Sequence, residues 1–452
     1  MIPLEVMTVC KTRIYLGLIS CLLVLSSCQK QFENRTDRIH LKHPQSGSST
    51  SPLMDEIAPR LGVLTADSTR LNTGTLHLFD LDGEPLPSYS PIPRVVSFQM
   101  NSRQIAYLSA ESSEDASLTL YLLNTNGMPL PYFTPIPGVD SINLSQNRLT
   151  YITRPTHPNS AFDLHRGTLH ILDQDGNPLT GASSIPNVCL DIPNPVQINA
   201  QSWIAYLSCE GEEGARMWNY VQLHVLNEQG SELTSFVPII QDQSFRFKFT
   251  DQLLSYVDHP PQRNPRPTAV RTLIIRDQAL TADPLLFREF RMNPFQLNAT
   301  MDLLATLTPD VTEPMTGHLM IISGQGRQIH APSFPVYLHP NQDSIMLAHQ
   351  RMLYLSQFDA ESDTATLHFL DAQGRELPSL SPIESIAAVI PTFNSTHLAY
   401  ISAQISGGSY SRDRDLIDQM EYHIHLLDLE GRPVPSYTPR MIERVKQIQL
   451  SE

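Results

Sequence analysis

The sequence has 452 residues, and its 31 Lys and Arg against 46 Asp and Glu give a formal net charge of −15. An acidic surface of this size argues against nucleic acid as a partner and against attachment to an anionic membrane by charge alone. The length suits one large all-β domain or several domains of ordinary size.

The N-terminus has the parts of a secretory signal. Lys11 and Arg13 precede the apolar run IYLGLISCLLVL, and small residues follow it. The run is too short to span a bilayer comfortably. We therefore interpret residues 1–27 as a signal peptide, the alternative being a buried core segment.

Residues Leu25, Ser26, Ser27 and Cys28 resemble the lipobox of bacterial lipoproteins. The resemblance implies cleavage before Cys28 and acylation of its thiol, with palmitate among the acyl groups. Gln29 stands where lipoproteins retained at the inner membrane usually carry Asp. The resemblance therefore implies anchoring in the outer membrane, with the domain facing the periplasm or, as the open alternative, the cell exterior.

Residues 28–56 are polar and rich in Ser and Pro. They include NRTDRIHLKHPQSGSSTSP, which has no hydrophobic periodicity. This composition is typical of a flexible linker. We expect a tether between the lipidated Cys28 and a folded domain over residues 57–452.

A five-residue phrase recurs eight times in that domain, with start-to-start spacings of 44 to 57 residues. Each copy is a short apolar run, which predicts a strand buried on both faces. A repeat of this period is typical of β-propeller blades. The copies are LHLFD (Leu76–Asp80), LYLLN (Leu120–Asn124), LHILD (Leu169–Asp173), LHVLN (Leu223–Asn227), LIIRD (Leu273–Asp277), LMIIS (Leu319–Ser323), LHFLD (Leu367–Asp371) and IHLLD (Ile424–Asp428).

Most copies run into a turn of the type D-x-D-G, as in DLDGEP, NTNGMP and DQDGNP. Glycine supplies the positive φ of a tight hairpin turn. We interpret the acidic residues as turn formers, because a calcium loop needs more oxygen ligands at fixed spacing. Proline-rich segments such as PLPSYSPIP follow, and proline belongs on an exposed edge strand because it donates no ladder hydrogen bond.

Each unit also has an upstream strand, such as RQIAYLSA, and a looser strand before it, such as VVSFQMN. The domain starts at PRLGVLTA, which lacks the looser strand, and ends with RVKQIQLSE, which is one. We therefore predict an all-β fold: an eight-bladed β-propeller of four-stranded antiparallel blades. In this prediction the C-terminal strand joins the N-terminal strands and closes the ring.

The unit resembles the TolB-type, WD-like propeller repeat of bacterial envelope proteins, which also runs from an I-A-Y-S strand to a strand followed by D-x-D-G. The resemblance covers about residues 58–452. The chain departs from that family at the inner turn, where NSRQ, SQNR and NSTH stand in place of S-P-D-G. The family implies scaffolds that bind proteins more often than enzymes.

Cys189 and Cys209 are the two cysteines that remain beyond the signal and the lipobox. In an oxidising compartment we predict a disulfide between them, the alternative being two buried thiols. Neither cysteine has a CxxC partner, so the pair does not resemble a zinc site.

Five copies of the phrase carry histidine at the second position: His77, His170, His224, His368 and His425. Tyr121, Ile274 and Met320 take this place in the other three. Because blades fan outward from an axis, equivalent positions lie far apart, so we predict packing histidines between blades and no metal site. The chain also contains no G-x-S-x-G, H-E-x-x-H or Walker A sequence, and we assign no catalytic residue and no cofactor.

The loops that join the AYLS strand to the LHLFD strand are long in four blades, at residues 154–167, 209–220, 258–271 and 403–422. Blades share one orientation, so these loops are expected on one face. Loops gathered on one face of a repeat protein mark the binding face, and aromatic and Arg side chains are frequent anchors there. The candidate binding residues are Trp218, Tyr220, Arg263, Arg266, Tyr410, Arg412 and Arg414.

Three functions follow as hypotheses. The first is a non-catalytic, lipid-anchored propeller that binds envelope proteins, touches the membrane through its anchor only and binds no nucleic acid. The second is a propeller of the cell envelope that binds a glycan or a small ligand in its funnel. The third is a hydrolase or lyase with a site in the funnel.

Overall fold

The structure is a computed structural model, and the residues that it describes belong to the compact unit Asp55–Glu452. The predicted signal peptide and tether, with Cys28, lie outside the described residues. The structure describes residues 60–451 except 68–69, 87–90, 111–116, 156–164, 181, 191, 193, 211–219, 234–238, 241–246, 251–252, 259–267, 277–278, 283–287, 291–295, 300–302, 311–315, 324–327, 331–335, 338–343, 349–350, 360–361, 363, 372, 378–381, 388–390, 395, 406–419, 436, 438–439 and 443–444.

The described residues form strands and turns, and one antiparallel hairpin recurs along the chain. Its first strand contains the AYLS-like segment and its second strand the LHLFD-like segment. The hairpins are β1 (Arg60–Asp67) with β2 (Arg70–Asp80), β4 (Gln104–Ala110) with β5 (Leu118–Asn124), β7 (Arg148–Thr153) with β8 (Arg166–Asp173), β11 (Ile204–Glu210) with β12 (Tyr220–Leu226), β15 (Leu253–Asp258) with β16 (Thr268–Arg276), β20 (Leu303–Pro309) with β21 (Thr316–Ser323), β25 (Arg351–Asp359) with β26 (Thr364–Leu370), and β29 (His397–Ile405) with β30 (Met420–Asp428).

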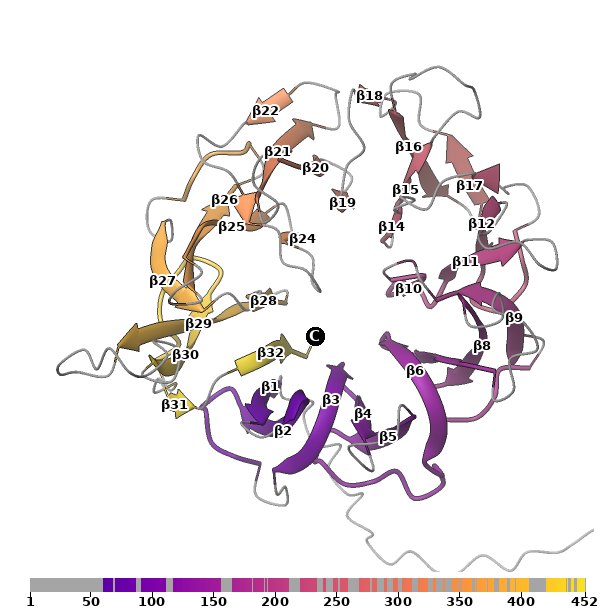
Figure 1. The fold of residues 1–452 in the computed structure, drawn as a ribbon, viewed down its shortest axis with the longest axis horizontal. Helices are drawn as coiled ribbons and strands as arrows, with labels where there is room; N and C mark the ends of the chain where they lie inside the picture. Colours follow the sequence, from indigo (N-terminus) through magenta and orange to yellow (C-terminus); the bar gives the residue numbers. More distant parts are fainter. Residues whose placement is uncertain are drawn as a thin grey trace, which may run out of the picture. The chain divides into compact units, whose positions relative to one another are not determined.

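A third strand pairs with the first strand of each hairpin, and Figure 1 shows these strands gathered around the centre. We call them the inner strands. β32 comes from the C-terminal end of the chain and pairs with β1, with Leu61 opposite Leu450. The inner strands are β3 (Ile92–Met100), β6 (Ile136–Leu144), β10 (Val196–Ile198), β14 (Phe247–Phe249), β19 (Gln296–Ala299), β24 (Ile345–Ala348), β28 (Thr392–Phe393) and β32 (Val445–Leu450).

Outer strands pair with the second strand of the hairpins, on the side away from the centre. The predicted proline-rich segments contribute in part: Pro85 forms a single bridge to Phe79, and Pro186 lies in the outer strand β9. Besides β3 and β6, the outer strands are β9 (Ser184–Cys189), β13 (Ile239–Ile240), β17 (Ala279–Ala282), β18 (Arg288–Phe290), β22 (Gln328–His330), β23 (Val336–Tyr337), β27 (Ile383–Ala387) and β31 (Arg440–Ile442).

Five of the described strands, β3, β6, β9, β23 and β27, each pair with the second strand of one hairpin and the first strand of the next. The beginning of β3 pairs with β2, and its remainder pairs with β4; β6 joins β5 to β7 in the same way. The sequence predicts separate edge and inner strands here, whereas the structure has one continuous strand. At the changeover the residue after Ile-Pro has a positive φ of 63° in Arg94 and 77° in Gly138, and this bulge redirects the strand.

The strands form three sheets of 14, 5 and 13 strands. Hydrophobic clusters fill the space between consecutive hairpins and also cross the sheet boundaries. Trp203 of one sheet packs in a cluster with Phe247 and Leu254 of the next. Leu61 and Ile401, from the first and third sheets, share another cluster. The apolar side chains of neighbouring hairpins therefore bury one another, as the repeat predicts.

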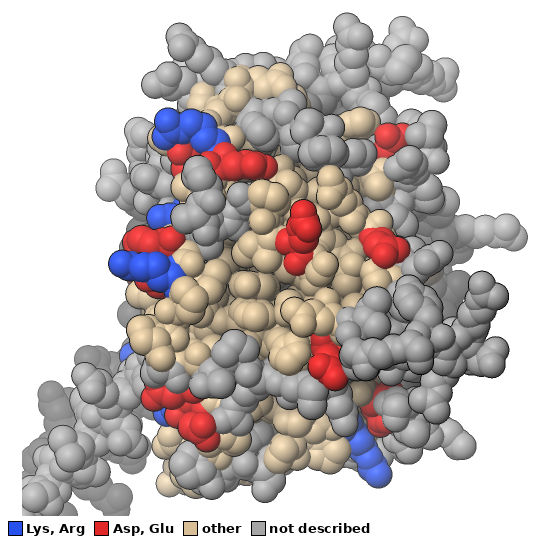
Figure 2. Space-filling view, turned by 90° about the vertical axis from the view of Figure 1, so that its left-hand side faces the viewer, with Lys and Arg blue, Asp and Glu red and all other residues tan. Residues whose placement is uncertain are grey.

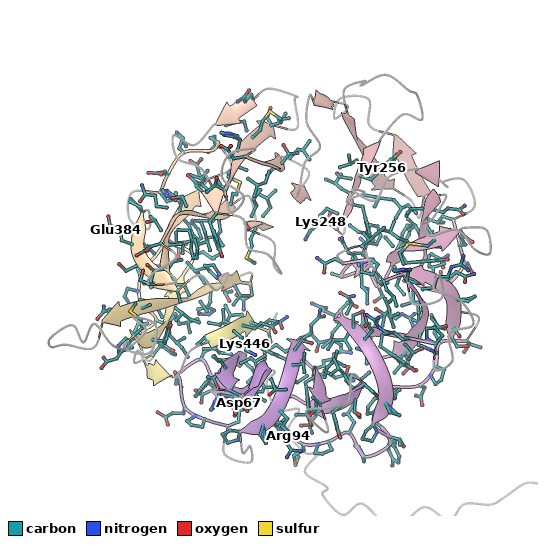
Figure 3. The ribbon with its side chains drawn as sticks, in the orientation of Figure 1. Asp67, Arg94, Lys248, Tyr256, Glu384 and Lys446 are labelled. Atoms are coloured by element: carbon teal, nitrogen blue, oxygen red, sulfur yellow. A yellow bond between two sulfur atoms is a disulfide. The ribbon has the colours of Figure 1, made fainter. Side chains whose placement is uncertain are left out.

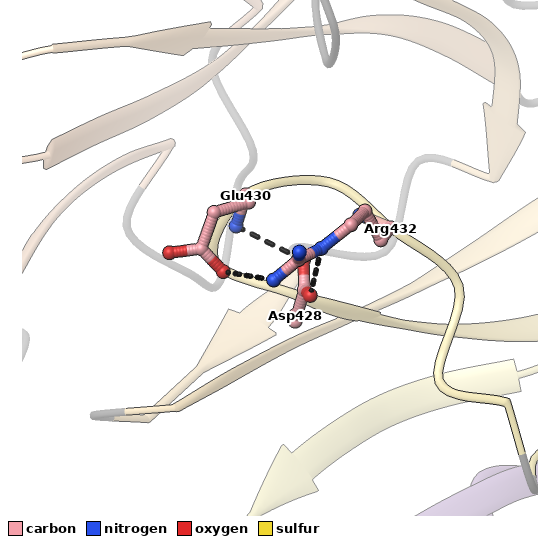
Figure 4. Close-up of polar contacts among 3 residues, drawn as sticks. All are labelled: Asp428, Glu430 and Arg432. Atoms are coloured by element: carbon pink, nitrogen blue, oxygen red, sulfur yellow. Dashed lines mark hydrogen bonds and ion pairs between the residues drawn. The ribbon is translucent and has the colours of Figure 1, made fainter.

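The turns after the second strands are built around their first residue. The Asp428 Oδ1 accepts hydrogen bonds from the backbone N–H groups of Glu430 and Arg432, and Gly431 has a φ of 85° (Figure 4). Asp173 and Asp371 accept equivalent bonds in their own turns. These acidic residues therefore close turns, as predicted.

One predicted correspondence is wrong. The alignment of LIIRD with the other copies places Ile274 at the histidine position. In the structure, Tyr256 lies opposite Arg271, and Ile274 lies opposite Leu253. The β16 strand ends five residues after Arg271, whereas β2 and β8 end three residues after their histidines, and its last residues pair with β17. The apolar run LII is therefore shifted relative to the other copies.

Candidate functional site

The predicted binding residues lie in long connections that join the two strands of four hairpins. Tyr220 is the first residue of β12, and its backbone pairs with Glu210. The other six, together with Cys28, lie outside the described residues: Trp218, Arg263, Arg266, Tyr410, Arg412 and Arg414.

A disulfide joins Cys189 to Cys209, as predicted, with a Cα–Cα distance of 5.2 Å. Cys189 ends the outer strand β9, and Cys209 lies in β11, one residue before the end of that strand. Both residues are fully buried in the cluster that contains Trp203. The bond therefore ties one hairpin's edge to the next hairpin at the base of the connection 211–219.

One pair of side chains, a tyrosine on the first strand and a histidine on the second, recurs as a unit at the same position of four hairpins. The two side chains stand directly opposite each other and stack, because paired residues of antiparallel strands lie close on the same face. The centroids of the stacked rings are 4.6 Å apart for Tyr151 with His170 and for Tyr354 with His368, and 4.7 Å for Tyr206 with His224 and for Tyr400 with His425.

Each of these histidines also meets a hydroxyl group on the first strand. The His Nε2 lies 3.0 Å from Thr153 Oγ1, and 2.7 Å from the Oγ of Ser208, Ser356 or Ser402 in the other units. The sequence predicts that the histidines pack between blades. The stacking and hydrogen-bond contacts described above lie within a single hairpin, because strand register brings both partners onto the same face. Packing against the neighbouring hairpin stays a prediction.

Two units add a carboxylate. Glu232 Oε1 lies 2.5 Å from His224 Nδ1, and Glu376 Oε1 lies 2.9 Å from His368 Nδ1. Hydroxyl, imidazole and carboxylate are thus connected in the order of a serine-hydrolase triad. Both serines are buried, however: Ser356 has no solvent exposure and Ser208 is 8% exposed, which leaves little room for a substrate at either hydroxyl. The arrangement braces the hairpin rather than presenting a nucleophile.

Burial governs the titration of these units. It lowers the pKa of His170 and of His425, and the neighbouring His423 adds to the effect on His425. It also raises the pKa values of Tyr206 and Tyr354, with the carboxylates of Glu232 and Glu376 contributing. Among the described residues, no three His, Cys, Asp or Glu side chains are placed to share a metal ion.

Side-chain amides connect the inner strands near the centre. Gln99 donates to the carbonyl of Ile142 (3.1 Å) and accepts from the N–H of Leu144 (2.6 Å). Gln197 makes the same pair of bonds with Phe247 (2.8 Å) and Phe249 (2.9 Å). Each amide substitutes for a peptide group between strands that do not pair directly.

Three asparagines make similar contacts, and two of them, Asn101 and Asn199, stand two residues after these glutamines. Asn101, Asn199 and Asn394 donate to the carbonyl groups of Ser145 (2.5 Å), Thr250 (3.3 Å) and Ser451 (2.8 Å), respectively. Their Oδ1 atoms accept N–H groups of their own inner turns. Sequence reasoning missed this role, although an Asn three to five residues before the AYLS strand in these three units is the signal that marks it.

Charged side chains complete the picture of centre and rim. Figure 3 shows Lys248 beside the centre and Glu384 at the outer rim. Lys446, on the inner strand β32, donates to the carbonyl of Thr73 at 2.9 Å. Two inner strands thus carry a lysine, whereas the outer rim carries both Glu384 and Arg94 (Figure 3).

Several solved structures are similar to this chain in strand arrangement. A eukaryotic initiation factor matches with a TM-score of 0.48 and 13% identity, over 86% of this chain and 98% of that one. The apo form of AztD from Citrobacter koseri matches with 0.48 and 9%, over 87% and 98%. The β-propeller domain of the Trilobed protease from Pyrococcus furiosus matches with 0.45 and 9%, over 77% and 96%. These likenesses concern the all-β fold and carry nothing about function.

No protein-family model matches the chain, and no curated protein matches it. The described residues include no helix with the length and apolar character needed to cross a membrane.

Proposed function

We propose that this protein is an outer-membrane lipoprotein whose β-propeller binds envelope proteins without catalysing a reaction. The anchor is Cys28, which follows Leu25, Ser26 and Ser27 in a lipobox-like segment. In this proposal the hairpins form eight four-stranded blades, and the pairing of β32 with β1 closes the ring. A closed ring of this kind is a rigid scaffold, because each blade is packed on both sides.

The observation that supports the proposal is the placement of the long connections. Residues 156–164, 211–219, 259–267 and 406–419 each join the first strand of a hairpin to the second. Repeated hairpins of one orientation deliver such connections to one face, while the D-x-D-G turns lie at the opposite strand ends. The Cys189–Cys209 disulfide braces one connection at its base. Braced loops on a rigid scaffold are a common form of protein-binding surface.

The test is site-specific photo-cross-linking in cells, with a photoreactive amino acid at Trp218 or Tyr410 and a matched control at Asp175. Asp175 lies in an exposed turn at the opposite strand ends. We expect one protein species to cross-link from the loop positions and not from Asp175, and to be lost when residues 406–419 are replaced by a short Gly/Ser linker. Equal or absent cross-linking from both faces, with folded protein, contradicts the proposal. Retention of sugar or small molecules by the purified protein then directs the search to the centre.

The anchor is tested separately by labelling cells with a palmitate analogue. The full chain is expected to incorporate the label and to fractionate with the outer membrane. The Cys28→Ala variant is expected to incorporate none. Incorporation by both chains, or by neither, contradicts acylation at Cys28.

A further inference from the structure

The connection from β5 to β6 differs from its counterparts in having no charged residue. The turn 124–128 reads NTNGM, whereas the other five turns of this type each carry at least one Asp, Glu or Arg: DLDGE, DQDGN, NEQGS, DAQGR and DLEGR. Residues 116–139 contain no Asp, Glu, Lys or Arg, in a chain with a net charge of −15. Figure 1 shows this connection on the outer rim. We call residues 124–138 the uncharged edge.

Two large apolar side chains are exposed on the uncharged edge, and they are the two exposed ones among the described residues. Met128 is 48% exposed and Tyr132 is 94% exposed. The equivalent positions elsewhere in the repeat are polar or small. Glu84, Asn177, Ser231, Arg375 and Arg432 correspond to Met128; Ser88, Gly181, Ser235, Ser379 and Ser436 correspond to Tyr132.

The fold itself does not require Tyr132. The following residue, Phe133, is the structural aromatic: it packs on the cluster around Leu122, and its N–H donates to Leu130 O at 3.1 Å. Tyr437 makes the equivalent bond to Val434 O at 3.0 Å and is buried. Four other turns carry serine at the position of Tyr132, so folding does not require an aromatic side chain there. A contact with another molecule therefore explains the tyrosine better than folding does.

Few backbone N–H groups of the uncharged edge depend on water as a hydrogen-bond partner. Pro129, Pro131, Pro135 and Pro137 have no N–H group. The N–H groups of Asn126 and Met128 donate to Asn124 Oδ1, that of Gly127 to Asn124 O, and that of Leu130 to Leu122 O. Few donors would lose a partner in an apolar environment, which keeps the desolvation cost low.

We propose that the uncharged edge docks on the lipid surface that carries the anchor, with Tyr132 and Met128 in the boundary between headgroups and acyl chains. The inference rests on the proposed acylation of Cys28 and goes beyond the expectation that only the anchor touches the membrane. Cys28 lies 32 residues before Arg60, a span of at most roughly 110 Å. The domain thus stays near the bilayer, where a second contact reinforces a lipid anchor.

Charge and side-chain chemistry favour lipid as the occupant. Figure 2 shows a side of the molecule with several separate Asp and Glu side chains, and surfaces of that kind are repelled by anionic headgroups. The uncharged edge is spared this repulsion. Tyrosine suits the membrane interface because its ring is apolar and its hydroxyl is polar.

The experiment uses the full acylated chain in phosphatidylcholine vesicles, with an environment-sensitive NBD label on Tyr132→Cys. The control is Asn177→Cys, the exposed counterpart of Met128 in the next repeat. We expect a blue-shifted label at 132 that lipid-attached nitroxides quench, and a water-exposed label at 177. In a second variant, Tyr132→Ser with Met128→Arg, the unacylated protein is expected to lose about tenfold or more in vesicle affinity at unchanged melting temperature.

The outcomes separate this inference from the anchor. A label at 132 that stays in water while the protein sediments with vesicles overturns the docking and leaves the anchor intact. If the chain isolated from cells carries no acyl group and still binds vesicles through Tyr132, the anchor is contradicted and the docking is supported. A label that is shielded only by added envelope protein, and never by vesicles, overturns lipid as the occupant.

Discussion

The hairpins β25–β26 and β29–β30 carry the same histidine unit with different third partners. His368 is held between Ser356 and the carboxylate of Glu376, whereas His425 has Ser402 on one side and Pro433 at the position equivalent to Glu376. The hairpins β11–β12 and β7–β8 repeat this contrast, with Glu232 in the first and Pro178 in the second. One residue of the outer segment therefore decides whether the imidazole Nδ1 has a carboxylate as its partner.

The comparison shows that the same backbone position can carry either a glutamate that binds the histidine or a proline that does not. Both residue types fit because the backbone bonds on either side are the same. Leu377 donates to Phe369 O and Val434 to Leu426 O, each at about the same length (2.9 and 3.1 Å). Proline rigidifies the edge, whereas glutamate gives the histidine an acceptor. The predictions below exploit this interchange.

The largest expected effect is that of removing the imidazole from the unit with a carboxylate. His368→Ala leaves the fully buried Ser356 hydroxyl without its partner and opens a cavity beside Tyr354. We expect a loss of about 3 kcal/mol in the free energy of unfolding, and about half as much for His170→Ala, whose imidazole is more exposed. Urea denaturation of both variants measures this, and equal losses would contradict the comparison.

The second prediction exchanges the third partners. Glu376→Pro removes the acceptor of His368 Nδ1 and is expected to cost about 1 kcal/mol, since no backbone bond is lost. Pro433→Glu brings a carboxylate toward His425 and is expected to raise the pKa of that imidazole. NMR titration of the histidines and urea denaturation check the pair. An unchanged pKa of His425 in Pro433→Glu would show that the carboxylate does not reach the ring.

The third prediction concerns pH. Burial lowers the pKa of His170 and His425 in the folded protein, so the unfolded chain binds protons that the folded chain resists. Their contribution to stability is complete above about pH 6.5, the ordinary value, and declines as the pH falls toward the lowered folded values. Tyr121 occupies the same position opposite Tyr107, so His170→Tyr with His425→Tyr preserves the stack.

Urea midpoints at pH 7.5 and pH 5.5 test this prediction. The parent chain is expected to lose more stability between the two pH values than the double variant does. A double variant with an undiminished pH dependence would place the responsible groups elsewhere.

The smallest effect is expected at arginines that belong to the turns and not to the histidine units. Arg375 pairs with Asp371 at 2.8 Å and Arg432 with Asp428 at 2.7 Å, one in each class of hairpin. Both guanidinium groups are exposed, so Arg375→Ala and Arg432→Ala are expected to change stability little and equally. A large difference between the two variants in urea denaturation would mean that hairpins with glutamate and hairpins with proline at this position also differ in the stability of their turns.

Sequence alone determined the features that are local. The period of the repeat, the apolar strands and the turns closed by Asp173 or Asp428 depend on residues within a few positions of one another. The disulfide was also predictable, because Cys189 and Cys209 are the two cysteines of the chain beyond residue 28. The all-β character follows from these features through the burial that each strand requires.

Tertiary structure decided what depends on register and on distant neighbours. The side-chain oxygen of Gln99 accepts a hydrogen bond from the N–H of Leu144, 45 residues away, and that of Gln197 from the N–H of Phe249, 52 residues away. The sequence does not show which side chains form such bonds between inner strands. The shift that places Arg271 and not Ile274 opposite Tyr256 is a choice between two apolar registers. The sequence pattern supports both, and only the packing of the finished sheet discriminates between them.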